Sequence, residues 1–367
     1  MKEEKKRILK LVEVGKLSAE EAITLIEQLE KDEAQSESKI TALSTEVLSS
    51  HSQKQEEYKS YTNKQSSLGS KLMEWVDTAV KKVKEVDLDL NFGKAMDVHH
   101  IFQFQHSTFD EIDIALVNGN VNVKPWAEQD IRVECDAKVY RVEDQDQARE
   151  LFLNSVDCQI EGNKFRFQTE KKSMKVSLIL YVPNQVYEQV KVKLFNGPIR
   201  GEQLRIKNLR AKTANGVVSF TSVKGDHAEL ETANGQIKAY QCDFKKIEAE
   251  SINGMVSIQG NSEKIDAQSF NGNLMITVTG NQCHTLYAKT TTGNIDIYTP
   301  ESARVIGELK TNLGALSSEL DTLEITHEKN ETIQKELRFK TNFLSDKELS
   351  LFADSKTGSI LIKHTKR

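Results

Sequence analysis

Cysteine, long apolar runs and an excess of basic charge are all scarce in this chain of 367 residues. Its four cysteines are far apart and form no C-x-x-C pair, which indicates reduced, partly buried thiols and not a disulfide framework. No stretch approaches the roughly 18 consecutive apolar residues of a transmembrane helix. The formal net charge of −5 removes the electrostatic argument for a nucleic-acid partner.

Motifs that carry chemistry are missing as well. The G-x-S-x-G, H-E-x-x-H and P-loop patterns do not occur. His99, His100 and His106 lie close together, but no cysteine or acidic side chain stands at zinc-ligand spacing, so we expect structural or solvated roles for them. We therefore predict no catalytic residue, no metal site and no cofactor, and a protein that is not an enzyme.

The start of the chain shows no secretory signal. Residues 1–7 lead into an amphipathic segment and not into a continuous apolar one. We expect a cytoplasmic protein, with peripheral membrane association as the alternative.

The sequence does contain a recurring Asn-Gly turn. The glycines of five copies are separated by 19, 19, 19 and 18 residues. An earlier copy precedes them, and weaker copies that keep only the glycine follow. A short fixed period of this kind is typical of a solenoid, in which each unit buries its apolar face by stacking on the next. The turn residues are Asn118, Gly119, Asn196, Gly197, Asn215, Gly216, Asn234, Gly235, Asn253, Gly254, Asn271, Gly272, Gly293, Gly314 and Gly358.

The residues around each glycine follow one pattern. Positions 7, 5 and 3 before the glycine, and 2 and 4 after it, are apolar or small, while the residues between them are mostly polar. Even spacing places the apolar set on one face of a strand. Each repeat is therefore expected to be two short strands, joined at an Asn-Gly corner whose residues tolerate positive φ.

Two architectures fit this pattern. Asn-Gly between alternating strands is also a strong hairpin signal, and a stack of hairpins would place the same residues inward. We favour a parallel β-solenoid with coils of about 19 residues, because residue types in phase favour like stacking on like. The predicted solenoid covers 87–367, with a helix-bearing insertion near 140–190 and a C-terminal cap near 320–350.

Residues 1–31 are predicted to form a helical hairpin. Ile8 and Leu11 mark the apolar face of its first helix, and Ile26 and Leu29 that of its second. A segment this short does not bury enough surface to fold alone, so we expect it to dock on a partner protein, on another copy or on the main domain. Residues 32–67 are rich in serine and other polar residues, which predicts a flexible linker.

Residues 68–86 are predicted to form an amphipathic helix, with Leu72, Trp75 and Val76 on its apolar face. One interpretation is a helix at a membrane surface, with Trp75 as the interfacial anchor. The other is a helix packed on the end of the solenoid. We favour packing, because the charges of the segment are nearly balanced and attraction to anionic lipid requires a basic excess.

These features together resemble a known family. The hairpin segment Leu17-Ser18-Ala19-Glu20-Glu21-Ala22, the Asn-Gly coils and the strand 87–93 are similar to the YvlB-like proteins of Gram-positive bacteria. The resemblance implies a short SHOCT-like module followed by an adhesin-type, right-handed parallel β-helix. It also implies a link to cell-envelope stress, in which related proteins of the LiaX type take part. The family has no established catalytic residues to transfer.

Three functions remain open on this basis. The leading hypothesis is a non-enzymatic scaffold of the envelope-stress response, with the solenoid as binding surface and residues 1–31 as docking module. The second is a self-assembling structural solenoid of the bactofilin kind. The third is a carbohydrate-active β-helix enzyme, whose acids would come from Glu248, Glu250, Asp266 and Asp296; we favour a solvated sheet face for these residues.

Overall fold

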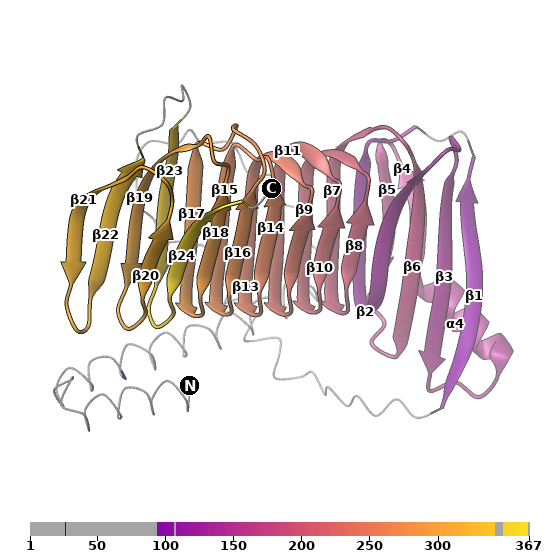
Figure 1. The fold of residues 1–367 in the computed structure, drawn as a ribbon. Coiled ribbons are helices and arrows are strands. Elements are labelled where there is room, and N and C mark those ends of the chain that lie inside the picture. Colours follow the sequence, from indigo (N-terminus) through magenta and orange to yellow (C-terminus); the bar gives the residue numbers. More distant parts are fainter. Residues whose placement is uncertain (1–25, 27–93, 106–107, 342–347, 366–367) are drawn as a thin grey trace.

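The computed structural model describes residues 26, 94–105, 108–341 and 348–365 (Figure 1). The predicted hairpin, linker and amphipathic helix lie outside these residues, except that Ile26 is helical and half-buried. The proposed contact residues Ile8, Leu11, Leu29, Leu72, Trp75 and Val76 also lie outside them.

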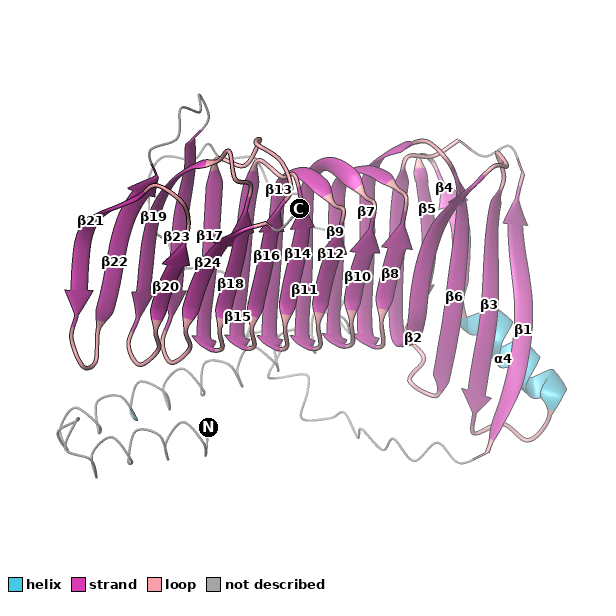
Figure 2. Ribbon diagram, in the orientation of Figure 1, coloured by secondary structure: helices cyan, strands magenta, loops and turns pink. Residues whose placement is uncertain are grey.

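The described chain is a β-solenoid made of two parallel sheets (Figures 1 and 2). Each coil contributes a longer strand to one sheet and a shorter strand to the other. The long sheet contains β7 Val186–Asn196, β9 Arg205–Asn215, β11 Lys224–Asn234, β13 Asp243–Asn253, β15 Lys264–Asn271 and β17 Thr285–Thr292. The short sheet contains β8 Ile199–Glu202, β10 Val218–Thr221, β12 Ile237–Tyr240, β14 Val256–Gly260, β16 Leu274–Val278 and β18 Ile295–Thr299.

The strand register separates the two architectures that the sequence allowed. Val218 pairs in parallel with Ile237, and Ile237 pairs with Val256, so equivalent residues of successive coils lie side by side. Asn215 and Asn234 are likewise register partners in the long sheet. The parallel coil is confirmed, and stacked hairpins are ruled out for these repeats.

Inward-facing side chains form one continuous core between the sheets. On the long sheet the buried positions run from a larger residue to small residues towards the corner, as in Ile247, Ala249 and Ser251. The short sheet faces them with branched side chains such as Val256 and Ile258. Stacking equivalent residues fills the narrow interior at constant thickness along the rod.

The N-terminal end is a broader cap. β2 Glu111–Trp126 bends through Asn118-Gly119 and contributes to both sheets, and β1 Ala95–Phe104, β3 Ile131–Tyr140 and β6 Met174–Pro183 extend one of them. The other sheet continues into β5 Lys164–Thr169 and β4 Asp157–Glu161. Helix α4 Gln145–Ser155 begins at Asp144, whose side chain accepts a hydrogen bond from the Gln147 amide, and buries Phe152 near Phe102 at this end.

The C-terminal coils do not stack in chain order. β19 Arg304–Thr311 and β20 Leu316–Glu319 form the outermost coil, followed by the antiparallel hairpin β21 Leu323–Asn330 and β22 Lys335–Thr341. The chain then returns: β23 Glu348–Ser355 lies between β17 and β19, and β24 Ile360–His364 lies between β18 and β20. The repeat at Gly358 is therefore inserted before the repeat at Gly314, an order that the linear spacing of the glycines did not predict.

Candidate binding surface

The Asn-Gly corners are joined by a ladder of side-chain amides along one edge of the rod. Each asparagine donates from Nδ2 to Oδ1 of the asparagine in the preceding coil, at 2.8–2.9 Å, from Asn196 on Asn118 to Asn271 on Asn253. An amide both donates and accepts, so every inner member of the ladder is satisfied from both sides. Stacked asparagines of this kind fix the register of parallel strands.

Glycine is required at these corners mainly because each corner packs closely against the backbone of the preceding coil. A Cβ built on Gly235 would lie 1.8 Å from the carbonyl oxygen of Gly216, and the same contact recurs at Gly254 and Gly272. Only Gly119 and Gly197 among the corner glycines have positive φ. The expectation that the corners need left-handed backbone was therefore wrong for the others, since close backbone stacking excludes a side chain there.

The same corners explain the hydroxyl residues three positions before each glycine. Thr232 donates from Oγ1 to the Gly216 carbonyl at 3.0 Å, and Ser251 donates to the Gly235 carbonyl at 3.1 Å. Thr213, Ser269, Thr290 and Ser355 make the equivalent bond one coil down. These hydroxyl groups supply a donor to the backbone carbonyls at the corners.

A second corner, from short strand to long strand, was missed by the sequence reasoning. Gln203, Ser222 and Gln241 occupy it with φ of 54°, 56° and 53°. These residues stand 19 apart, but none is a glycine or asparagine, so composition gave no signal of left-handed backbone there. The signal that the sequence did offer for this corner was the recurrence of these positions every 19 residues.

The outward face of the long sheet carries two neighbouring rows of polar and charged side chains. In the first coils these are basic: Lys191 and Lys193 on β7, then Arg210 and Lys212 on β9. In the next coils they become acidic. The acidic and amide residues are Glu229, Glu231, Glu248, Glu250, Asp266 and Gln268. Glu248 thus stacks on Asp266 in one row and Glu250 on Gln268 in the other, and the three acidic residues are half-buried where we expected full solvation.

Lys212 joins the basic and acidic parts. Its Nζ lies 3.0 Å from Oε1 of Glu229 and 2.8 Å from Oε1 of Glu231, and Arg210 Nε lies 2.6 Å from Glu229 Oε2. Burial raises the pKa of Glu231 to about 8, although the charge of Lys212 acts in the opposite direction. Burial also raises the pKa of Asp266. Carboxyl groups on an outward sheet face are thus shielded from water.

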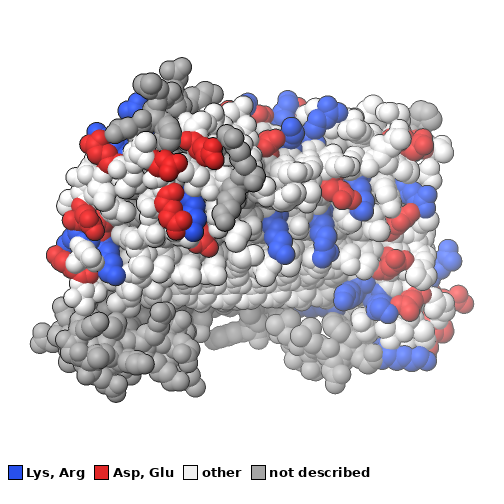
Figure 3. All heavy atoms as spheres, viewed as in Figure 1, with Lys and Arg blue, Asp and Glu red and all other residues white. Residues whose placement is uncertain are grey.

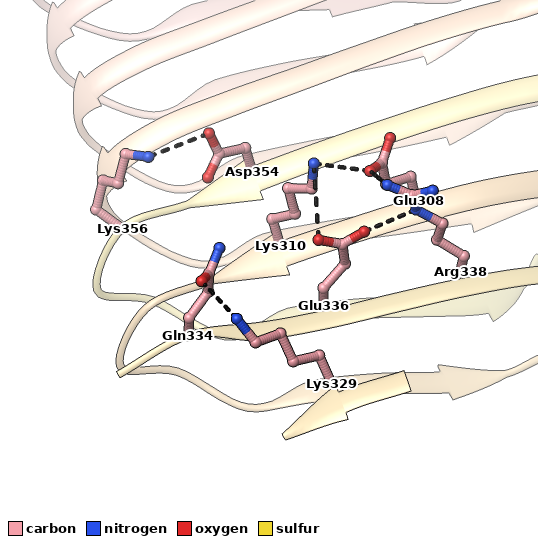
Figure 4. A network of polar contacts seen from close by, with 8 residues as sticks. All are labelled: Glu308, Lys310, Lys329, Gln334, Glu336, Arg338, Asp354 and Lys356. Carbon is pink, nitrogen blue, oxygen red and sulfur yellow. Dashed lines mark hydrogen bonds and ion pairs between the residues drawn. The ribbon is translucent and has the colours of Figure 1, made fainter. Parts of the chain in front are cut away.

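Towards the C-terminal end the rows continue as an ion-pair network (Figure 4). Arg338 on β22 lies 3.0 Å from Glu308 on β19 and 2.7 Å from Glu336, and Lys310 lies 2.7 Å from Glu308. These pairs connect the hairpin to the outermost coil. On the face seen in Figure 3, side chains of both signs are interspersed.

Beside the charged rows lies an outward line of apolar side chains, which we call the apolar stripe. Its members stand two positions before the corner glycine, out of phase with the core positions. They form two clusters separate from the core, although Phe195 is 7% and Ile252 is 3% exposed. The stripe consists of Val117, Phe195, Ala214, Ala233, Ile252 and Phe270.

The histidines and cysteines form no site among the described residues. His99 pairs with Asp136, and within residues 94–105, 108–341 and 348–365 no group of three or more His, Cys, Asp and Glu side chains could hold a metal; His106 lies outside them. The four cysteines are free, and burial raises the pKa of Cys242 to about 11, which disfavours the reactive thiolate. In the described part of the chain, no helix is long and apolar enough to cross a membrane.

Comparison with known proteins supports this architecture. The family model described as Toastrack DUF4097 matches residues 109–342. The chain belongs to the Toastrack family. A SHOCT-like domain model matches residues 3–34 of this Toastrack chain. The uncharacterized protein YvlB of Bacillus subtilis (strain 168) is 52% identical over 370 residues, and the match covers 100% of both chains. The YvlB-like resemblance is thereby confirmed.

Solved structures of low identity match the Toastrack chain as well. A candidate adhesin of Parabacteroides merdae is 11% identical, with a TM-score of 0.41 over 73% of this chain and 96% of that one. A candidate adhesin of Bacteroides fragilis is 11% identical, with a TM-score of 0.39 over 72% of this chain and 97% of that one.

Proposed function

We propose that this Toastrack protein is a non-enzymatic binding scaffold of the cell-envelope stress response. The long sheet is its binding surface, and the SHOCT-like segment 1–31 docks on a protein partner. The protein acts in the cytoplasm, and peripheral membrane contact through 68–86 is the alternative for its location.

The observation that carries the proposal is the ordered outward face of the long sheet. The amide ladder and the stacked glycines hold equivalent residues of successive coils in one register, so the charged rows keep fixed spacing along the rod. A rigid surface loses little conformational entropy when it binds a partner. The acids considered for catalysis at Glu248, Glu250 and Asp266 belong to these two rows, which fits a recognition surface.

Self-assembly of the bactofilin kind is less well supported. In the long sheet the C-terminal end of the rod is an antiparallel hairpin, so the outermost strand of that sheet does not offer the parallel edge on which another coil would stack. Sedimentation velocity at rising concentration tests this alternative, and growth into filaments would favour it.

The experiment that tests the proposed function uses the native host under an envelope-targeting antibiotic. Deletion of the gene is expected to change survival and the output of an envelope-stress reporter, and the full chain should restore both. The double variant Ile8→Asp/Leu11→Asp, which removes the predicted apolar face of the hairpin, should fail to restore them at equal protein level.

The matched control is Lys6→Gln, which alters the same segment on the opposite side of the predicted helix and should restore both readouts. Fractionation of the same cells, with and without the antibiotic, tests the location. Unchanged survival and reporter output in the deletion strain would remove the envelope-stress proposal.

A further inference from the structure

The apolar stripe faces outward, yet five of its members are buried and Phe270 is partly buried. Its members alternate with core residues along the long strands, as Ile252 does with Ser251, and they belong to clusters that do not join the core. Side chains on the open face of a sheet are normally in part exposed to water. The 3% exposure of Ile252 and the 0% exposure of Ala233 therefore indicate a covering layer on this face.

We propose that residues 68–86 of the same chain bind along the apolar stripe as an amphipathic helix. This inference goes beyond the proposed function and does not depend on it. A helix of 19 residues is about 28 Å long. The stripe crosses successive coils from Val117 to Phe270, which at the strand spacing of a sheet is about 24 Å. The two lengths agree.

The point where the chain enters the solenoid supports this occupant. Val98 of β1 pairs with Ala137, Ala137 with Val176, and Val176 with Gly119, so β1 crosses the row of the corner glycines. β1 begins at Ala95, only three residues before that row. The preceding chain therefore arrives at the corner edge, next to the stripe.

The short connection also fixes the direction of the helix. Residues 87–94 can span at most about 29 Å when fully extended. β3 and β6 separate β1 from β2, which is about 14 Å. Phe270 lies about 24 Å further away, beyond that reach. Val86 must therefore lie near the Val117 end and Leu68 near the Phe270 end.

This direction predicts a register. A helix rises about 1.5 Å per residue, so about three residues cover one coil. With the helix centred on the stripe, Leu72 lies level with Ile252 and Trp75 level with Ala233. The small side chains of Ala214 and Ala233 leave room for the indole between the larger residues on either side. Lys71 then lies level with Glu250, and the opposite charges of these two side chains favour an ion pair.

The consequence is a fixed anchor for the N-terminal module. If 68–86 is bound, the SHOCT-like segment is tethered to the rod through residues 32–67, whose root-mean-square span as a flexible linker is about 30–36 Å. The module is then confined to the Phe270 end of the long sheet, and the helix occupies part of the surface offered to a partner.

Tryptophan fluorescence of the full chain tests the proposal. The chain has two tryptophans, so Trp126→Phe leaves Trp75 as the single reporter. We expect blue-shifted emission and weak quenching by acrylamide, both lost in Ile252→Lys or Ala233→Glu. The matched control is Met275→Lys, a half-exposed position on the short sheet, which should leave the emission unchanged.

Disulfide trapping identifies the occupant. Oxidation of the full-chain variant Leu72→Cys/Ile252→Cys should give a cross-link within one monomer, while Leu72→Cys/Met275→Cys should give none. Solvent-like Trp75 emission in the isolated protein, or a shift only on adding anionic phosphatidylglycerol vesicles, would overturn the proposal in favour of a membrane site. A cross-link found only between two chains would overturn it in favour of a second copy.

Discussion

At the scale of single residues, the corner glycines and the hydroxyl groups beside them hold the coils together. Gly235 is constrained by the carbonyl of Gly216, and Thr232 donates its hydroxyl hydrogen to that same carbonyl. Each coil therefore fixes the position of the next. A residue larger than glycine would clash at position 235, and a side chain without a hydroxyl group at position 232 would lose the hydrogen bond.

The first prediction concerns Gly235→Ala. The added methyl group would meet a backbone carbonyl, which cannot rotate away, so we expect a loss of about 1–3 kcal/mol in the free energy of unfolding. Urea denaturation followed by circular dichroism measures it. Gly162→Ala is the control: nothing lies within 4 Å of its Cβ position, so only the cost of its φ of 59° applies. An equal loss in the two variants would mean that stacking is not the constraint.

The second prediction concerns Thr232→Val, which keeps the shape of the side chain and removes its hydroxyl. The Gly216 carbonyl loses its side-chain donor, and we expect a loss of about 1 kcal/mol. Thr221→Val, an exposed threonine at the end of β10, is the matched control and should change the denaturation midpoint little. No difference between the variants would show that water replaces the bond.

At the scale of elements, the long sheet combines a charged outer face with local shielding from water. Glu231 lies beside Lys212 on that face, and its pKa is raised to about 8, first by burial. An unfolded chain binds this proton only up to the ordinary range of a glutamate, near pH 4–5. The folded protein therefore holds the Glu231 proton more tightly than the unfolded chain does.

The third prediction follows from that difference. Because the folded pKa is raised, the contribution of Glu231 to stability is complete below about pH 4 and declines as the pH rises towards 8. The melting temperature of the wild type should fall more steeply over this range than that of Glu231→Gln, which has no proton to lose. Thermal scans from pH 4 to pH 8 measure the difference. If the melting temperatures of the two proteins changed in parallel with pH, the raised pKa would not belong to Glu231.

The fourth prediction concerns the inserted coil. Ending the chain after Thr341 removes β23 and β24, which separate β17 and β18 from β19 and β20. The outermost coil and the hairpin then lose their parallel neighbours. We expect limited proteolysis to trim this variant back to about residue 300, whereas the full chain resists. A variant that ends at Pro300 removes more residues, but every coil that it retains is still stacked on the preceding coil. It should therefore be the more resistant of the two truncations.

At the scale of the whole molecule, the sequence predicts repetition well and exceptions poorly. The parallel stacking of the Asn-Gly coils followed from residue types in phase, as at Val218, Ile237 and Val256. The insertion of the Gly358 repeat before the Gly314 repeat left no local mark, because both repeats satisfy the same pattern and only long-range pairing orders them.

The candidate surface was only partly visible in the sequence. Glu248, Glu250 and Asp266 were grouped as outward acids, and they do lie in the two neighbouring rows of the long sheet. Asp296, which was grouped with them, lies instead on β18 of the short sheet. The apolar stripe was missed, because its members vary from alanine to phenylalanine and stand next to core residues in sequence. Burial on an outward face becomes apparent only when the direction of each side chain is known.

The returning C-terminal strands also bear on how the protein is made. A ribosome releases residues 348–364 after the coils on both sides of them, yet these residues occupy a position between those coils in the rod. This end of the solenoid therefore cannot close until residues 348–364 have been synthesised. A chain that stops early keeps an open strand edge and exposed core residues such as Leu286 and Ile297, which a cellular protease or chaperone can recognise. The topology thus distinguishes chains that contain β23 and β24 from chains that stop before them.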